Sequence, residues 1–342
     1  MGITGMFGQP LAEFLGESDL GKLLATVAEA GAQIARRIAF GPLNGDPAEV
    51  VGAHADGDAQ KALDVDADNV FVEALTSASV RGVVSAERAA PVPLDPQGAF
   101  LVAIDPLDGG SNIETDVTVG SLVAILDAPQ GPGFDGDLFL QPGHRQRAAV
   151  LILYGPHVEF VFSVGAGTHV ATLDPATGGF RMTKFSLSIP EGRSEFAINA
   201  ANARHWPEPV QAYVADLVMG ESGPRAKPYD MRWIAAVAAD AYRVLIRGGS
   251  YLYPDDGRPG YRQGRLRLIY EANPIALLIE QAGGMATDGV NRILDLAPTE
   301  LRQRTPLIFG SSDKVERIRR YYIEGHRSAS RAPLFGKRGL LR

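Results

Sequence analysis

Cysteine is absent from all 342 residues of the sequence. Its absence excludes disulfides, thiolate zinc sites and thiol redox switches, and it agrees with an expected cytoplasmic location. Apolar runs of membrane-spanning length are also missing, and no signal peptide is visible, so no membrane partner is expected. The formal net charge of −7 argues against nucleic-acid binding. An anionic ligand would therefore need a metal ion or clustered arginines.

What remains is an ordinary globular composition, with 45% hydrophobic and 21% charged residues. A chain of this length favours two domains. We predict an N-terminal domain at residues 1–187, a C-terminal domain at 188–322 and a loose basic tail at 323–342. The boundary lies where strands joined by short turns give way to alternating strands and helices.

The predicted fold class is α/β, with helices layered on a large, mainly antiparallel sheet and on a smaller second sheet. Helices are expected at 18–38, 66–77, 207–219 and 231–247, from 273, and over 315–322, with a mobile loop at 44–57. Strands are expected at 81–85, 100–104, 117–126, 148–154, 158–164, 168–173, 179–183, 195–199, 266–270 and 306–310.

An acidic, glycine-rich turn follows the apolar segment 100–104. It reads Asp105-Pro106-Leu107-Asp108-Gly109-Gly110-Ser111-Asn112. Two carboxylates three residues apart at a strand end are ligands that a hard divalent cation prefers. The backbone N–H groups of the glycines suit an anion beside that cation. The turn therefore predicts a magnesium site next to a phosphate.

Other acidic residues are placed where they can join this turn. Asp58 and Asp64 lie at the start of the second helix, Glu87 follows the strand at 81–85, and Glu271 follows the strand at 266–270. Taken singly, each is typical of a solvated loop residue. The residues alone leave a metal site and a plain acidic surface both open.

A second group of residues is basic and aromatic. It comprises Arg232, Trp233, Tyr251, Tyr253, Arg265 and Arg267, with Asn199 at the end of an earlier strand. Arginine offers paired donors that match phosphate geometry, so this group can hold a remote phosphate. The alternative is that the arginines are surface residues and the tyrosines only pack.

The turn at 105–112 resembles the signature of the lithium-sensitive, magnesium-dependent sugar-phosphatase superfamily, which includes inositol monophosphatases. Segments 57–64, 83–87, 112–120, 248–254 and 264–287 further resemble class I fructose-1,6-bisphosphatase. The resemblance covers residues 15 to 322. It implies stacked α-β-α-β-α layers, a homotetramer, and hydrolysis of the 1-phosphate of fructose 1,6-bisphosphate in gluconeogenesis or Calvin-type metabolism.

The resemblance also implies a role for each candidate residue. Glu87, Asp105, Asp108 and Glu271, with the Leu107 carbonyl, match ligands for two or more Mg²⁺ or Mn²⁺ ions. Asp58 and Asp64, together with Glu87, match the catalytic acids that activate water. Asp108, Gly109, Gly110 and Ser111 would hold the 1-phosphate. Asn199, Arg232, Tyr253 and Arg265 would hold the sugar and its 6-phosphate, with Arg232 reaching in from a neighbouring subunit.

Several positions depart from the family pattern. Ala86 replaces a glutamate, Arg265 replaces a lysine, Asn202 and Trp233 replace tyrosines, and Ala99-Phe100 replace an AMP-binding Lys-Tyr pair. The altered sugar end leaves sedoheptulose 1,7-bisphosphate open as a substrate, alone or alongside. An inositol-type monophosphatase and, because of Ala86, a non-catalytic sugar-phosphate sensor are the further alternatives.

Overall fold

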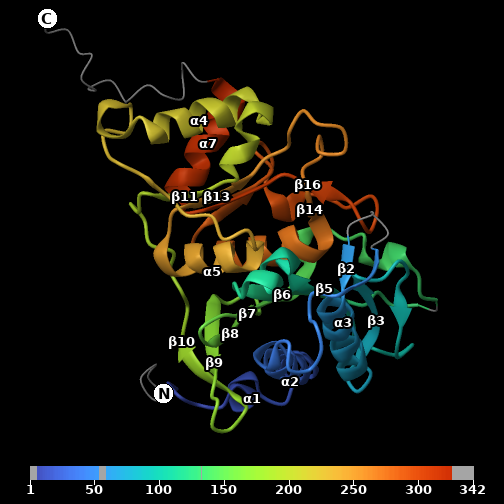
Figure 1. Ribbon diagram of the computed structural model, residues 1–342. Coiled ribbons are helices and arrows are strands. Elements are labelled where there is room, and N and C mark those ends of the chain that lie inside the picture. Colours follow the sequence, from blue (N-terminus) through green and yellow to red (C-terminus); the bar gives the residue numbers. More distant parts are fainter. Residues whose placement is uncertain (1–5, 54–58, 132, 326–342) are drawn as a thin grey trace, which may run out of the picture.

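A computed structural model describes residues 6–53, 59–131 and 133–325. Five layers follow one another in it: helices α1 to α3, an eight-stranded sheet, helices α5 and α6, a five-stranded sheet, and helices α4 and α7 (Figure 1). The predicted α-β-α-β-α layering is confirmed. The division predicted at residue 187 falls between the last strand of the larger sheet and the first strand of the smaller one. In the described part of the chain, no helix is both long and apolar enough to span a membrane.

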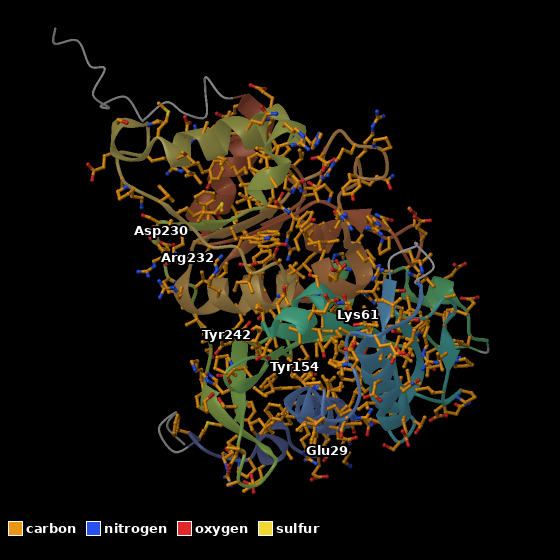
Figure 2. All side chains as sticks on the ribbon, in the orientation of Figure 1. Glu29, Lys61, Tyr154, Asp230, Arg232 and Tyr242 are labelled. Carbon is orange, nitrogen blue, oxygen red and sulfur yellow. The ribbon has the colours of Figure 1, made fainter. Side chains whose placement is uncertain are left out.

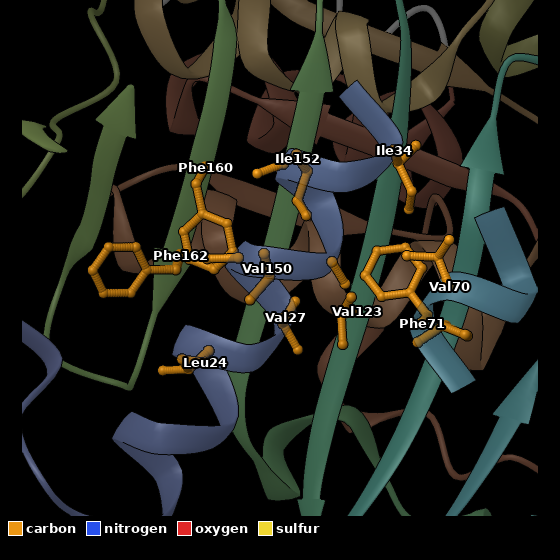
Figure 3. Close-up of a cluster of buried hydrophobic side chains, with 14 of the residues drawn as sticks. Leu24, Val27, Ile34, Val70, Phe71, Val123, Val150, Ile152, Phe160 and Phe162 are labelled. Atoms are coloured by element: carbon orange, nitrogen blue, oxygen red, sulfur yellow. The ribbon is translucent and has the colours of Figure 1, made fainter. Parts of the chain in front are cut away.

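The first layer comprises α1 (Leu11–Leu15), α2 (Asp19–Phe40) and α3 (Ala62–Leu75). Helix α2 is capped by Ser18, whose hydroxyl accepts the N–H of Gly21 at 3.1 Å. Figure 3 shows its apolar face against the larger sheet. The helix backbone comes close there, because a Cβ on Gly31 would lie only 2.5 Å from the side chain of Ile152.

The larger sheet has the strand order β10-β9-β8-β7-β6-β5-β3-β4. Its strands are β3 (Val80–Ser85), β4 (Val92–Pro93), β5 (Phe100–Asp108), β6 (Val119–Asp127), β7 (Gln146–Tyr154), β8 (Val158–Ser163), β9 (Thr168–Leu173) and β10 (Phe180–Lys184). As predicted, the sheet is mainly antiparallel. Its exception is β3, which runs parallel to β5 with Ser85 opposite Ile104. The segments after both strands therefore emerge at the same edge of the sheet.

The smaller sheet has the order β12-β11-β13-β17-β15. Its strands are β11 (Glu195–Ala197), β12 (Asp230–Met231), β13 (Ser250–Tyr253), β15 (Met285–Thr287) and β17 (Leu307–Gly310). Helices α5 (Val237–Arg247) and α6 (Asn273–Gln281) lie between the two sheets, while α4 (Glu208–Val218) and α7 (Ser312–Glu324) cover the outer face. Two short ribbons pair β1 (Val50–Ala53) with β2 (Ala59–Lys61), and β14 (Leu266–Arg267) with β16 (Arg304–Thr305).

Some predicted bounds were wrong near the site. Helix α3 begins at Ala62 rather than 66, because the Asp64 carboxylate accepts the N–H of Lys61 at 2.8 Å and so caps the helix. The predicted loop at 44–57 contains β1, while residues 54–58 lie outside the described ranges.

Two elements of the second half also differ from prediction. The predicted helix at 231–247 begins only at Val237, since residues 230–231 pair with β11 and Ala235 has a positive φ of 66°. The predicted strand at 266–270 ends at Arg267. A turn of π-helix follows over Leu268–Ala272, and Glu271 is buried within it.

Candidate functional site

One cavity of about 510 Å³ collects most of the predicted site residues. The predicted residues in its lining are Asp64, Glu87, Asp105, Leu107, Asp108, Gly109, Gly110, Ser111, Tyr253, Arg265 and Glu271. They come from α3, from the ends of β3, β5 and β13, and from the turns around β14. The fold thus brings these predicted residues together around one cavity.

The carboxylates of the cavity are largely removed from water. Asp64, Asp105 and Glu271 are only 5–7% exposed. Burial raises the pKa of Glu87 to about 8, against the opposing hydrogen bond from Gln60. Burial, followed by the charge of Asp105, raises the pKa of Glu271 to about 7. Burial also raises the pKa of Asp105 and Asp108.

Each of three acids is held by a donor from the protein. Glu87 Oε2 accepts from Gln60 Nε2 at 2.7 Å, and Asp108 Oδ2 accepts from the N–H of Ala238 at 2.7 Å. Glu271 Oε2 accepts from the N–H of Arg267 at 2.5 Å. These bonds anchor the carboxylates to β2, to the first turn of α5 and to β14.

The turn after β5 is tightly constrained. Gly109 has φ of +91°, and a Cβ there would lie 2.6 Å from the Cβ of Ala236, so only glycine fits. The Asn112 amide donates to the carbonyls of Thr118 at 3.1 Å and Ile234 at 3.0 Å. The turn is thereby fixed to the segments directly before β6 and α5.

Lys61 is a site residue that the sequence prediction missed. Its ammonium group lines the cavity and donates to the Gly110 carbonyl at 2.8 Å and to Glu114 Oε1 at 2.6 Å. Figure 2 labels its position. The sequence did hold a signal for Lys61, because this residue lies within segment 57–64, which resembles the family. The sequence prediction also missed the neighbouring Gln60. Arg304, which donates to the Arg265 carbonyl at 2.9 Å, lies in no motif that could have identified it.

The lining of the cavity also contains cationic and aromatic side chains. They are Tyr253, Arg265, Arg267 and Arg304. Arg267 and Arg304 lie beside the acids, because the charges of both lower the pKa of Glu271. Burial raises the pKa of the Tyr253 hydroxyl, and the nearby Arg265 charge partly offsets that rise. We call the carboxylates and glycines of the lining the acidic end of the cavity, and Tyr253 with Arg265 the basic end.

Three predicted site residues are not part of this lining. Asn199 lies in a small adjoining pocket that shares Tyr253 with the cavity. Arg232 is 55% exposed, lies 3.6 Å from Asp230, and stands well apart from Lys61 in Figure 2. Asp58 lies outside the described residues.

The donor set of the acidic end suits a hard divalent cation. Within residues 6–53, 59–131 and 133–325, no three acidic or histidine side chains already stand close enough to surround one ion. The donors available are carboxylate and carbonyl oxygens, which Mg²⁺ and Mn²⁺ prefer. Burial and mutual repulsion raise the pKa of these acids, and a bound cation opposes both effects. The chemistry of the residues fits a divalent metal.

A larger cavity of about 890 Å³ lies at the far end of β3 and β5 and is lined by Arg81. The two terminal nitrogens of that guanidinium donate to the carbonyls of Pro129 and Gly131. Arg81 therefore anchors the loop after β6, and we assign no ligand to this cavity.

Comparisons with known proteins place the chain in a family. Residues 7–185 match the description "Fructose-1-6-bisphosphatase, N-terminal domain", and residues 189–323 match "Fructose-1-6-bisphosphatase, C-terminal domain". The fructose-1,6-bisphosphatase class 1 of Rhizobium meliloti is 51% identical over 292 residues, which cover 85% of this chain and 84% of that protein.

A protein of the same class from Xanthobacter autotrophicus is 47% identical over 337 residues, covering 96% of this chain and 90% of that one. The holo crystal structure of Leishmania major fructose-1,6-bisphosphatase matches with a TM-score of 0.87 at 30% identity, covering 93% of this chain and 99% of that chain. Both halves of the chain, its fold and its full-length relatives thus agree. The chain belongs to the class 1 fructose-1,6-bisphosphatase family.

Proposed function

We propose that this chain hydrolyses the 1-phosphate of fructose 1,6-bisphosphate, giving fructose 6-phosphate and inorganic phosphate. The observation that carries the proposal is the two-ended cavity of about 510 Å³. Its acidic, glycine-lined end suits a metal and the reacting phosphate, and its Tyr253–Arg265 end suits a second, remote phosphate. Family membership gives the reaction and the sugar.

Glu87, Asp105, Asp108 and Glu271, with the Leu107 carbonyl, would hold the metal. When bound, Mg²⁺ or Mn²⁺ supplies charge neutralisation for the phosphate oxygens and lowers the pKa of water. The backbone N–H groups of Gly109, Gly110 and Ser111 would orient the 1-phosphate. We propose that each subunit binds at least two ions. Ala86 leaves one carboxylate fewer than the resemblance implies, so metal titration is needed to count the ions.

Asp64 is the residue best placed to accept a proton from the attacking water. A Cβ on Gly110 would lie 3.6 Å from Asp64 Oδ1, so this carboxylate faces the turn that would hold the phosphate. Lys61 connects the start of α3 to the same turn through the Gly110 carbonyl. Asp58 is proposed to assist Asp64.

Arg265 and Tyr253 would bind the 6-phosphate, and this remote contact would position the reacting phosphate. Asn199 borders the same end. Arg232 is proposed to complete the site of a neighbouring subunit in a homotetramer, which agrees with its exposed guanidinium. A cytoplasmic location stays a prediction, as does the domain boundary at residue 187.

Sedoheptulose 1,7-bisphosphate is the second candidate substrate. Trp233 stacks on Tyr251, with ring centroids 5.6 Å apart and planes 10° from parallel. Trp233 therefore packs against Tyr251 and Tyr253 and is not among the residues that line the cavity. A sugar end with fewer side-chain contacts favours tolerance of a longer sugar.

The test is to incubate the full chain with Mg²⁺ and fructose 1,6-bisphosphate and to identify the products by phosphorus NMR. We expect fructose 6-phosphate and inorganic phosphate in equal amounts, with Asp64→Asn losing turnover. Fructose 1-phosphate as the product would reverse the assignment of the two ends. Full activity in Asp64→Asn would remove Asp64 from its proposed role.

A further inference from the structure

A stack of side chains lies behind the basic end of the cavity, in the loop between β13 and β14. The ring of Tyr261 contacts two guanidinium groups. The Arg258 Cζ is 4.3 Å from the ring centroid and the Arg265 Cζ is 4.6 Å from it. Arg265 Nη1 also donates to the Tyr261 hydroxyl. Tyr261 therefore holds Arg265 both by its ring and by its oxygen.

The outer end of the stack is fixed by an ion pair. Arg258 Nε lies 3.1 Å and 3.0 Å from the two carboxylate oxygens of Asp256, which also accepts from Nη2. Asp256 is 7% exposed, and these bonds hold its pKa below the ordinary value. Asp256 thus offsets the charge of Arg258 and limits its repulsion of Arg265.

The backbone of the loop holds the stack in place. Asp256 N donates to the Tyr261 carbonyl at 3.2 Å, and Tyr261 N donates to the Arg258 carbonyl at 3.1 Å. Gly264 N also donates to the Tyr261 carbonyl, at 3.0 Å, directly before Arg265. Among these residues only Arg265 lines the cavity, so the stack supports it from behind.

We propose that Tyr261 is a positioning residue that, with Arg258 and Asp256, aims the Arg265 guanidinium at the remote phosphate and so favours bisphosphates over monophosphates. This inference rests on the proposed function. A free arginine side chain samples many rotamers, whereas paired donation to a phosphate needs one orientation of its plane. Contact with the aromatic face restricts that plane before the ligand arrives, which lowers the entropy lost on binding.

The test compares two substrates. We would measure kcat and KM of Tyr261→Leu, Tyr261→Phe and wild type with fructose 1,6-bisphosphate and with fructose 1-phosphate, which lacks the remote phosphate. For Tyr261→Leu we expect KM for the bisphosphate to rise about tenfold, and the preference for it over fructose 1-phosphate to fall by the same factor. Tyr261→Phe keeps the ring but loses the hydroxyl, and we expect its preference for the bisphosphate to fall only about threefold. An unchanged preference in Tyr261→Leu would overturn the proposal.

Arg258→Gln and Arg262→Gln are the matched pair that separates the stack from charge alone. Both remove one positive charge from the same loop, but Arg262 is exposed and has no place in the stack. We expect Arg258→Gln to weaken the preference for the bisphosphate and Arg262→Gln to keep it. Equal effects would mean that the loop acts only through its net charge.

A binding measurement keeps the inference separate from catalysis. Fructose 6-phosphate carries the remote phosphate and needs no turnover, so its affinity is measured by calorimetric titration. We expect Tyr261→Leu to bind it about tenfold more weakly, with unchanged thermal unfolding. Wild-type protein that releases no phosphate would defeat the proposed function, while this titration would still decide the role of Tyr261. Equal affinity in the two proteins would overturn that role.

Discussion

Gln60 holds Glu87 by its side-chain amide, with Gln60 Nε2 2.7 Å from Glu87 Oε2 and 3.3 Å from the Glu87 carbonyl oxygen. Gln60 belongs to β2, directly before α3, and Glu87 follows β3. The bond favours the ionised carboxylate, because an amide donor lowers the pKa that burial raises. It also orients the acid that stands next to Ala86, the position where the resemblance implies a second glutamate.

Gln60→Leu removes this donor while keeping the size of the side chain. We expect the affinity for Mg²⁺ to fall about tenfold, since groups that orient a metal ligand typically contribute that much. Calorimetric titration of the full chain with Mg²⁺ measures it. Gln33→Leu on the exposed side of α2 is the control. An unchanged affinity would mean that Glu87 needs no help from Gln60.

Asp108→Asn separates the charge of the turn from its shape. The amide oxygen can still accept from Ala238 N–H, so the fold is expected to persist. Loss of the negative charge should lower Mg²⁺-dependent turnover about a thousandfold or more. Asp127→Asn, at the exposed end of β6 in the same sheet, is the control. Near-normal turnover of Asp108→Asn would exclude this acid from the site.

The stability of the metal-free protein is expected to depend on pH in an unusual direction. The pKa of Glu271 rises from 4.5 to about 7 and that of Glu87 from 4.5 to about 8 on folding. Each raised pKa contributes stability that is complete below pH 4.5 and is lost as the pH rises to about 7 and 8. Thermal unfolding in a chelator should therefore show a falling melting temperature over this window.

Saturating Mg²⁺ should reverse that loss, because a bound cation favours the ionised carboxylates and stabilises only the folded chain. The same melts repeated with Mg²⁺ measure the difference between the two conditions. A chelated protein that becomes more stable between pH 5 and pH 8 would contradict the assigned pKa directions.

Glu195, far from the cavity lining in the sequence, is expected to give the opposite dependence of stability on pH. It is 3% exposed and pairs with Arg247, Arg193 and Arg243, which together hold β11 against α5. The hydrogen bond from Arg247, the largest of these effects, lowers the pKa of Glu195 to about 2. The stability that Glu195 contributes to the fold is therefore present above pH 4.5 and is lost as the pH falls toward 2.

Glu195→Gln is expected to lower the free energy of unfolding by about 2 kcal/mol at pH 7, since arginines are left without their counter-charge. Urea unfolding measures it, with the exposed Glu221→Gln as the control. A change equal to that of the control would show that the cluster contributes little.

The sequence predicts the central sheet because its strands are continuous apolar runs. The apolar segment 100–104 forms the first part of β5, but the predicted end was wrong, because the strand continues through a register shift to Asp108. Glu87 follows β3 as expected. The shared edge of β3 and β5 then follows from their parallel pairing. The proximity of Glu87 and Asp105 was therefore predictable from the strand pattern, whereas the positions of Asp64 on α3 and Glu271 on a π-helical turn were not.

The remaining parts of the site depend on contacts that no local pattern encodes. Glu271 enters the cavity on a turn of π-helix, whose spacing resembles neither a strand nor an ordinary helix. Arg304 reaches Arg265 only because β16 pairs with β14. Lys61 acts through a carbonyl that lies 49 residues further along the chain. These relationships depend on tertiary packing.

The central claim is that one cavity accepts a sugar with two phosphates, and the rate of phosphate release tests it most directly. Purified protein with Mg²⁺ would be supplied in turn with fructose 1,6-bisphosphate, sedoheptulose 1,7-bisphosphate and inositol 1-phosphate. We predict a strong preference for the fructose bisphosphate over inositol 1-phosphate, and comparable rates on both bisphosphates would make the chain a dual enzyme. No release from any of the three, with Mn²⁺ as well as Mg²⁺, would contradict the account and favour a sugar-phosphate sensor.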